Sequence, residues 1–331
     1  MPEHGGDLAG ASREYRIPVE RWLDLSTGIN PLGYPVPLVP ASDWLRLPSD
    51  LGPLRRAARD YYQADSLLPV AGTQAAIQAL PRLRPRSRVM LSVPTYNEHA
   101  HAWRRHGHAV RMVAARNFDE HLVQADVLIV CNPNNPSGER IDTAQLLEWH
   151  ANLGARGGWL IVDEAYIDAT PEASLAVHAV RPGLVVLRSL GKFFGLAGAR
   201  VGFVFAGADV LRALQDELGP WTVSGPAQFV SCAALSDRIW QARTRAALTQ
   251  AGRRLNALLA RVGIAAQGTA LFQWWQDKRA RELHRDLARQ AILTREFRGI
   301  EPGGIRFGLP GVEEEWQRLE QALDRGMKYR E

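Results

Sequence analysis

Short apolar runs alternate with longer amphipathic stretches through the middle of the sequence. The runs have the length of β-strands, and stretches between them, such as residues 141–155, have the pattern of helical crossovers. Because parallel sheets need helices on both faces, the alternation predicts an α/β protein with a mostly parallel sheet. The expected strands are residues 89–93, 110–113, 127–130, 159–162, 184–187 and 201–205.

The remaining segments predict an N-terminal arm and a second, smaller domain. The first forty residues are rich in Gly and Pro, with one short strand near Leu23, and we expect them to pack as an arm on the small domain. Residues 225–262 have a helical pattern long enough for a connector. Further strands are expected at 271–275, 291–294 and 305–308, with helices at 279–289 and 312–327. We therefore expect an arm at 1–40, a large domain at 41–245 and a small α/β domain at 246–331.

Composition narrows the possible partners. The 331 residues are 46% hydrophobic, which is enough for a substantial core and more than one domain. The formal charge of +5 is spread without a long basic run, so we expect small anionic ligands and no nucleic acid. No stretch has the pattern of a leader peptide or of a membrane-spanning helix, so we expect a cytoplasmic protein without a membrane partner.

The two cysteines, Cys131 and Cys232, lie far apart in the sequence, each in an apolar context. Reduced core residues are therefore expected instead of a disulfide or metal ligands. The sequence contains no His/Cys cluster with ligand spacing, so we expect no metal.

Lys192 stands on a glycine-rich turn directly after the apolar run 184–187. The residues that follow it, Phe193-Phe194-Gly195-Leu196, predict apolar surroundings that favour a neutral, nucleophilic amine able to attack an aldehyde. A lysine that extends from a buried turn to solvent is the structural alternative, and this stretch alone does not decide between the two.

A lysine that binds the aldehyde of pyridoxal 5'-phosphate needs a carboxylate for the pyridine nitrogen, donors for the ring oxygen, a stacking ring and a phosphate cradle. Asp163 ends the apolar run 159–162, so it is expected at the carboxyl edge of the sheet, where ligands bind. A protonated pyridine would supply the cation that a buried carboxylate needs. The alternative is an N-cap for a following helix. Tyr166 places a phenol near the same edge.

The segment 131–138, Cys-Asn-Pro-Asn-Asn-Pro-Ser-Gly, directly follows the run 127–130. Two prolines restrict this loop and are expected to direct the amide of Asn135 towards the sheet edge. Turn formation alone is the alternative, but an eight-residue motif directly after a strand favours a functional loop.

The tripeptide 72–74, Gly-Thr-Gln, begins a predicted helix, where free backbone N–H groups and a hydroxyl suit a phosphate. Helix capping alone is the alternative. Ser189 and Arg200 could add a hydroxyl and a guanidinium to the same phosphate. Tyr96, just after the run 89–93, could stack on the cofactor ring or belong to the core.

Together these residues resemble the fold type I pyridoxal-phosphate enzymes, in the branch of the histidinol-phosphate aminotransferases and threonine-phosphate decarboxylases. The resemblance covers nearly the whole chain, and the motifs follow the same order. It implies a large domain with a mostly parallel seven-stranded sheet, a smaller C-terminal α/β domain and an N-terminal arm. It also implies roles for ten residues: Lys192 as the catalytic lysine that binds the cofactor, Asp163 at the pyridine nitrogen, Asn135 and Tyr166 at the ring hydroxyl, Tyr96 on the ring face, and Gly72, Thr73, Gln74, Ser189 and Arg200 at the phosphate.

The N-terminal segment looks like that of the cobalamin-pathway threonine-phosphate decarboxylases, whose arm folds over the active site. The similar stretches are His-Gly-Gly-Asp at 4–7 and Trp-Leu-Asp-Leu-Ser-Thr-Gly-Ile-Asn-Pro at 22–31. This resemblance implies that His4, Gly5 and Asn30 contact the substrate, that Arg295 meets its phosphate and that Arg306 grips its carboxylate.

Arg295 and Arg306 are separated by a turn at 301–304, a spacing that predicts both side chains on one face of a small sheet. Without the resemblance, Arg306 would be interpreted as a surface arginine on an edge strand. One departure concerns the Tyr-Pro pair of histidinol-phosphate aminotransferases, whose phenol reaches the neighbouring subunit's cofactor phosphate. The corresponding place here is Leu47-Pro48.

The resemblance therefore implies a homodimeric enzyme that acts on a small phosphorylated amino acid. The reaction would be decarboxylation of L-threonine O-3-phosphate to (R)-1-aminopropan-2-yl phosphate in cobalamin biosynthesis. Amino transfer on histidinol phosphate or a related amino acid is the alternative, and a binding protein of the same fold without catalysis is a third. The choice between the first two depends on which bond to Cα is held perpendicular to the cofactor ring, and the sequence leaves it open.

Overall fold

The computed structural model describes residues 4–327, which divide into two compact units. The large unit consists of Gly33–Asn135 and Glu139–Arg243. The small unit combines the N-terminal segment up to Leu32, the short stretch Pro136–Gly138 and the chain from Thr244 onward.

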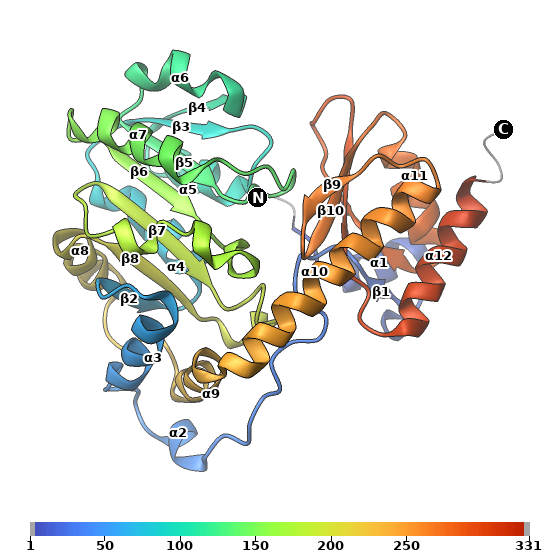
Figure 1. Ribbon diagram of the computed structural model, residues 1–331, viewed down its shortest axis with the longest axis horizontal. Coiled ribbons are helices and arrows are strands. Elements are labelled where there is room, and N and C mark those ends of the chain that lie inside the picture. Colours follow the sequence, from blue (N-terminus) through green and yellow to red (C-terminus); the bar gives the residue numbers. More distant parts are fainter. Residues whose placement is uncertain (1–3, 328–331) are drawn as a thin grey trace. The chain divides into compact units, whose positions relative to one another are not determined.

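The large unit is built on a seven-stranded sheet with the order β2-β8-β7-β6-β5-β3-β4 (Figure 1). Neighbouring strands are parallel except at β8, which is antiparallel to both β7 and β2. The mostly parallel seven-stranded sheet is therefore confirmed. The strands are β2 (Leu67–Val70), β3 (Arg88–Ser92), β4 (Ala109–Val113), β5 (Val127–Cys131), β6 (Trp159–Asp163), β7 (Leu184–Ser189) and β8 (Gly202–Ala206).

Helices cover both faces of this sheet. On one face, buried residues of α4, α5 and α8, such as Trp103 and Leu214, pack against Val127 and other strand residues. On the opposite face, Tyr62 of α3 packs edge-on against Phe203 and Phe205, with ring centroids 5.4 and 5.2 Å away. No helix within residues 4–327 is long and apolar enough to cross a membrane. The helices are α2 (Ala41–Leu45), α3 (Gly52–Tyr62), α4 (Thr73–Ala79), α5 (Asn97–Arg105), α6 (Phe118–His121), α7 (Thr143–Gly154), α8 (Ala208–Leu218) and α9 (Gly225–Ser236).

The single long helix predicted at 225–262 is in fact two helices, α9 and α10 (Arg238–Arg261). The break falls at Asp237, which ends α9 outside the helical conformation. Its carboxylate accepts the backbone N–H of Trp240 at 2.9 Å, as an N-cap residue does at the start of a new helix. The chain passes from the large to the small unit within α10, between Arg243 and Thr244.

The small unit contains an antiparallel sheet of order β12-β13-β10-β9 and a parallel pair, β1 with β11. The strand predicted at 291–294 is present but shorter, because it ends at Leu293 and a second short strand, of a different sheet, begins after buried Thr294. The strands are β1 (Leu23–Asp24), β9 (Gln267–Thr269), β10 (Phe272–Gln276), β11 (Ile292–Leu293), β12 (Arg295–Glu296) and β13 (Gly304–Gly308).

The N-terminal segment contains a helix, α1 (Leu8–Tyr15), that the sequence did not predict. Asp7 caps it by accepting the N–H of Gly10 at 2.8 Å. Ala11 of α1 packs in one apolar cluster with Trp22 and with Ala288 at the end of α11 (Ala280–Arg289). Together with α12 (Glu313–Met327), these helices complete the described part of the small unit.

Candidate active site

A cavity of the large unit lies at the carboxyl ends of β5, β6 and β7, where Cys131, Asp163 and Ser189 end the strands. All ten residues for which the resemblance implies a role at the cofactor line this cavity: Gly72, Thr73, Gln74, Tyr96, Asn135, Asp163, Tyr166, Ser189, Lys192 and Arg200. The structure thus brings them together as a sheet-edge site requires. Their individual roles remain predictions.

Lys192 faces this cavity from a turn anchored in the core. The next two residues, Phe193 and Phe194, are fully buried, and the Phe194 ring stacks on Trp240 at 5.6 Å. The Lys192 amine lies over the ring of Tyr166, with Nζ 5.6 Å from the ring centroid. Lys192 therefore does not simply extend from a buried turn to bulk solvent.

Asp163 is the last residue of β6 and is 5% exposed. One carboxylate oxygen, Oδ1, accepts the N–H of Ala165 at 3.1 Å, and the other lies 2.9 Å from Nε2 of His99. The next helical turn begins at Ile167, with Tyr166 in the cap position. Among the described residues Asp163 caps no helix, so the N-cap interpretation is wrong.

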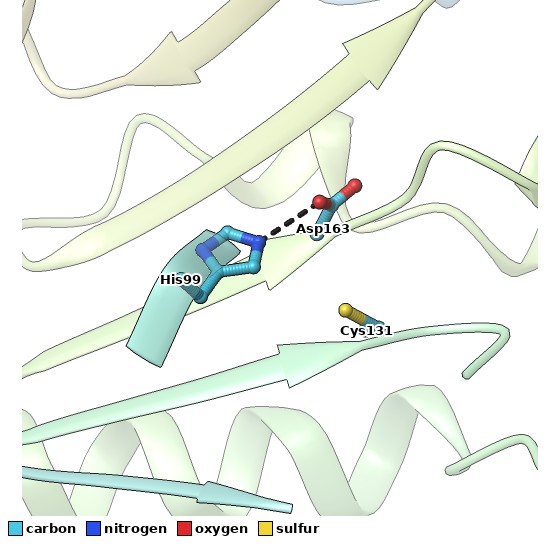
Figure 2. Close-up of side chains that lie close together, drawn as sticks. All are labelled: His99, Cys131 and Asp163. Atoms are coloured by element: carbon cyan, nitrogen blue, oxygen red, sulfur yellow. Dashed lines mark hydrogen bonds and ion pairs between the residues drawn. The ribbon is translucent and has the colours of Figure 1, made fainter. Parts of the chain in front are cut away.

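His99, in the first turn of α5, is a site residue that the sequence analysis missed. Burial lowers the pKa of His99, but hydrogen bonds to Asp163 and to the Cys131 thiol outweigh burial and raise that pKa to about 10. The raised pKa favours the protonated form of the His99 ring beside Asp163. Figure 2 shows His99 pointing to Asp163 from a different element. In the sequence, His99 stands three residues after Tyr96, and its place in the first turn of α5 is known only from the structure.

The sequence has no His/Cys cluster with ligand spacing, but the fold brings one group of potential ligands together. The potential ligand atoms of His99, Cys131 and Asp163 lie within 4.8 Å of one another, and all three residues are buried (Figure 2). They come from α5, β5 and β6, so no sequence spacing reveals them. Both Cys131 and Cys232 are free thiols, and the absence of a bound metal stays a prediction.

The His99–Asp163 pair predicts a pH dependence of stability. Folding raises the pKa of His99 from 6.5 to about 10, so its contribution is complete below about pH 6.5 and is lost as the pH rises towards about 10. Urea unfolding across that range should show a loss on the order of a few kcal/mol in the parent that is absent in His99→Asn. His101→Asn, a variant on the same helix, should lose as much stability with rising pH as the parent does. An equal loss of stability with rising pH in the parent and in His99→Asn would contradict the raised pKa of His99.

At the end of the cavity where the cofactor phosphate is expected, the backbone of Gly72 lies close to the guanidinium of Arg200. Gly72 has φ +73, a conformation that favours glycine, and a Cβ built on it would lie 2.7 Å from Nη2 of Arg200. Among the described residues, no side chain caps α4, whose N-terminal residues Thr73 and Gln74 line the cavity. A helix N-terminus beside an arginine and the Ser189 hydroxyl suits a phosphate.

The loop that carries Asn135 is braced by two other amides of the motif. Asn132 bonds both backbone groups of Ile141, at 2.9 and 3.0 Å. Asn134 donates to the carbonyl of Pro94 at 3.0 Å and accepts from the Thr95 hydroxyl at 3.0 Å. Asn135 is thereby held at the cavity, as the sequence predicted.

A separate cavity of the small unit brings together three of the five residues predicted to bind substrate, His4, Gly5 and Arg295. Nη1 of Arg295 donates to the carbonyl of His4 at 3.3 Å. Asn30 and Arg306 do not line this cavity. Asn30 is buried and accepts the N–H of Leu32 at 3.0 Å.

Arg306 is buried in the interior of the small sheet. It is 5% exposed, and its strand β13 lies between β12 and β10, so the interpretation as a surface arginine on an edge strand is wrong. Its register partner on β12 is Arg295. Because directly opposite residues of an antiparallel pair share a face, the prediction that both arginines lie on one face is confirmed. Both guanidinium groups lie near the Phe297 ring, 5.2 Å away for Arg295 and 5.8 Å for Arg306.

Comparisons with known proteins agree with this architecture. The family described as aminotransferase class I and II matches residues 47–325. The chain therefore belongs to the aminotransferase class I and II family.

Two relatives extend over almost the whole chain. A threonine-phosphate decarboxylase of Pseudomonas aeruginosa is 52% identical over 324 residues, which cover 98% of this chain and 97% of that protein. A threonine-phosphate decarboxylase of Sinorhizobium sp is 43% identical over 337 residues, with 97% of both chains covered. Among solved structures, L-threonine-O-3-phosphate decarboxylase from Porphyromonas gingivalis has a TM-score of 0.76 at 21% identity and covers 92% of this chain and 99% of that one, a likeness of fold.

Proposed function

We propose that this protein is a pyridoxal-phosphate-dependent carboxy-lyase that converts L-threonine O-3-phosphate to (R)-1-aminopropan-2-yl phosphate in cobalamin biosynthesis. The observation that carries the proposal is the 52% identity, over nearly the full chain, to a protein named threonine-phosphate decarboxylase. The cavity supports it, because its lining offers an anion site at Arg200 and a buried carboxylate at Asp163, as the two ends of the cofactor require.

When bound, pyridoxal phosphate supplies an aldehyde that combines with amines and a ring that accepts an electron pair. Asp163, backed by His99, holds the pyridine nitrogen in its protonated form, and Asn135 and Tyr166 bind the ring hydroxyl. Tyr96 covers the ring face, while Arg200, Ser189 and residues 72–74 bind the phosphate. Lys192 would hold the aldehyde carbon through Nζ, and once the substrate amine has displaced it, its Nζ would supply the proton that replaces the departing CO2 at the substrate Cα.

Two cationic side chains hold the ends of the substrate in this proposal. Arg306 binds the carboxylate that is lost, and Arg295 binds the phosphate, with His4, Gly5 and Asn30 as further contacts. The register of β12 and β13 supports the pairing, because it places both arginines on one face. An aminotransferase acting on histidinol phosphate remains the second candidate, favoured by the shared family and by similarity over about half of the chain to proteins of that name.

We also propose that the enzyme is a cytoplasmic homodimer. Support for an interface comes from the segment 38–47 of the large unit, where Leu38 is 96% exposed, Leu45 84% and Trp44 69%. Leu47, which stands where histidinol-phosphate aminotransferases carry a tyrosine, is also exposed. A second copy that covers this segment would remove the apolar side chains from water.

The substrate proposal predicts a selective defect in Arg295→Ala. Losing a charge-assisted contact to phosphate should lower kcat/KM for phosphothreonine by about 10- to 100-fold, whereas unphosphorylated threonine, which lacks the group, should change little. Decarboxylation rates with both substrates measure this. The control is Arg289→Ala on α11, where Arg289 donates to Asp286. This variant should behave like the parent with both substrates. Equal losses for the two substrates would remove Arg295 from the phosphate site.

A further inference from the structure

Glu98 is a buried carboxylate beside the cavity that the proposed mechanism does not use. It stands in the first turn of α5, directly before His99, and is 7% exposed. Its Oε2 accepts the side-chain N–H of Gln74 at 2.6 Å and that of Gln78 at 3.2 Å, and both glutamines belong to α4. A carboxylate is costly to bury without such donors. Glu98 therefore joins the N-terminal turn of α5 to α4, whose first residues line the cavity.

The carboxylate also fixes the direction of a hydrogen-bond chain. Because Nε2 of Gln74 donates to Oε2 of Glu98, the amide oxygen of Gln74 faces away from Glu98. That oxygen lies 3.2 Å from the Tyr96 hydroxyl, which must donate. Burial raises the pKa of the Tyr96 phenol well above its ordinary value, which keeps that donor proton in place. The two hydrogen bonds therefore run in one direction, from the Tyr96 hydroxyl to Gln74 and from Gln74 to Glu98.

We propose that Glu98 is a positioning residue for the cofactor site. Through Gln74 it fixes both the Tyr96 ring that covers the cofactor and the N-terminal turn of α4 at the phosphate. The ring of Tyr96 also packs edge-on against the ring of His99, with the centroids 6.1 Å apart. The inference rests on the proposed cofactor. It adds a residue that touches neither cofactor nor substrate.

The test compares three variants by their dissociation constants for pyridoxal 5'-phosphate, measured by fluorescence quenching on cofactor-depleted full-length protein. Glu98→Ala should bind about 10-fold more weakly, because a hydrogen bond to a charged group is lost and the Gln74 amide is released. Glu98→Gln retains an acceptor oxygen and should stay within about 3-fold of the parent. Gln78→Ala, which loses a bond to the same carboxylate without touching Tyr96, should stay within about 2-fold.

A double-variant cycle with Tyr96→Phe tests the relay itself. If Glu98 acts through the Tyr96 hydroxyl, Glu98→Ala should cost clearly less binding in the Tyr96→Phe background than in the parent. Additive losses would overturn the relay. Parent-like binding by Glu98→Ala, or binding by Glu98→Gln as weak as that of Glu98→Ala, would overturn the proposal as a whole. These measurements need no turnover, so their failure is distinguishable from failure of the proposed reaction.

Discussion

Lys192→Ala is expected to fold normally and to lose turnover by several orders of magnitude, because it removes both the cofactor's covalent partner and the proton carrier. The described lysines are Lys192 and Lys278, and the third, Lys328, lies outside the described residues. Borohydride reduction of the parent should attach one cofactor to the peptide that contains Lys192.

The matched control is Lys278→Ala, which changes an exposed lysine of the small unit. It should retain both the label and the turnover of the parent. Covalent cofactor in reduced Lys192→Ala would assign the attachment to another residue and would refute the role given to Lys192.

Asp163→Asn is expected to have the second largest effect. It keeps the size of the side chain and its bond with Ala165 but removes the charge that holds the pyridine nitrogen protonated. The loss of transition-state stabilisation should be about 2 to 4 kcal/mol, a fall of roughly 30- to 1000-fold in turnover number. Steady-state rates at saturating cofactor measure the effect.

His99→Asn provides the comparison for Asp163→Asn, because it keeps the carboxylate and removes only its partner. We expect a smaller fall in turnover than in Asp163→Asn, together with the flattened pH profile of stability. An unchanged turnover number in Asp163→Asn would mean that this carboxylate has no part in the chemistry.

The sheet was predictable where its strands are continuous apolar runs, and not where they are interrupted. β2 was missed because Pro69 breaks its run, which this edge strand tolerates. Arg188 lies within β7 and is 1% exposed, bonded to the buried carboxylates of Glu164 and Asp168. The sequence does not reveal that these three charged residues pair, because the pairing depends on how β6 and β7 align.

The ten residues that line the cavity were predictable because they stand in or beside short motifs that the family resemblance identifies. Glu98 and His99 carry no motif of their own. Their contribution depends on where α5 packs, which puts His99 beside Asp163 and Glu98 beside Gln74. Arg306 was misplaced without the family resemblance because charge alone suggests a surface, whereas the strand order buries it.

The most direct test of the proposed function is a paired assay on the purified protein loaded with pyridoxal phosphate. One arm measures CO2 released from L-threonine O-3-phosphate, and the other measures turnover of histidinol phosphate that depends on an added 2-oxo acid. We predict CO2 release in step with formation of (R)-1-aminopropan-2-yl phosphate and no dependence on a 2-oxo acid. Turnover of histidinol phosphate with a 2-oxo acid, without CO2 from phosphothreonine, would contradict the assignment and identify an aminotransferase.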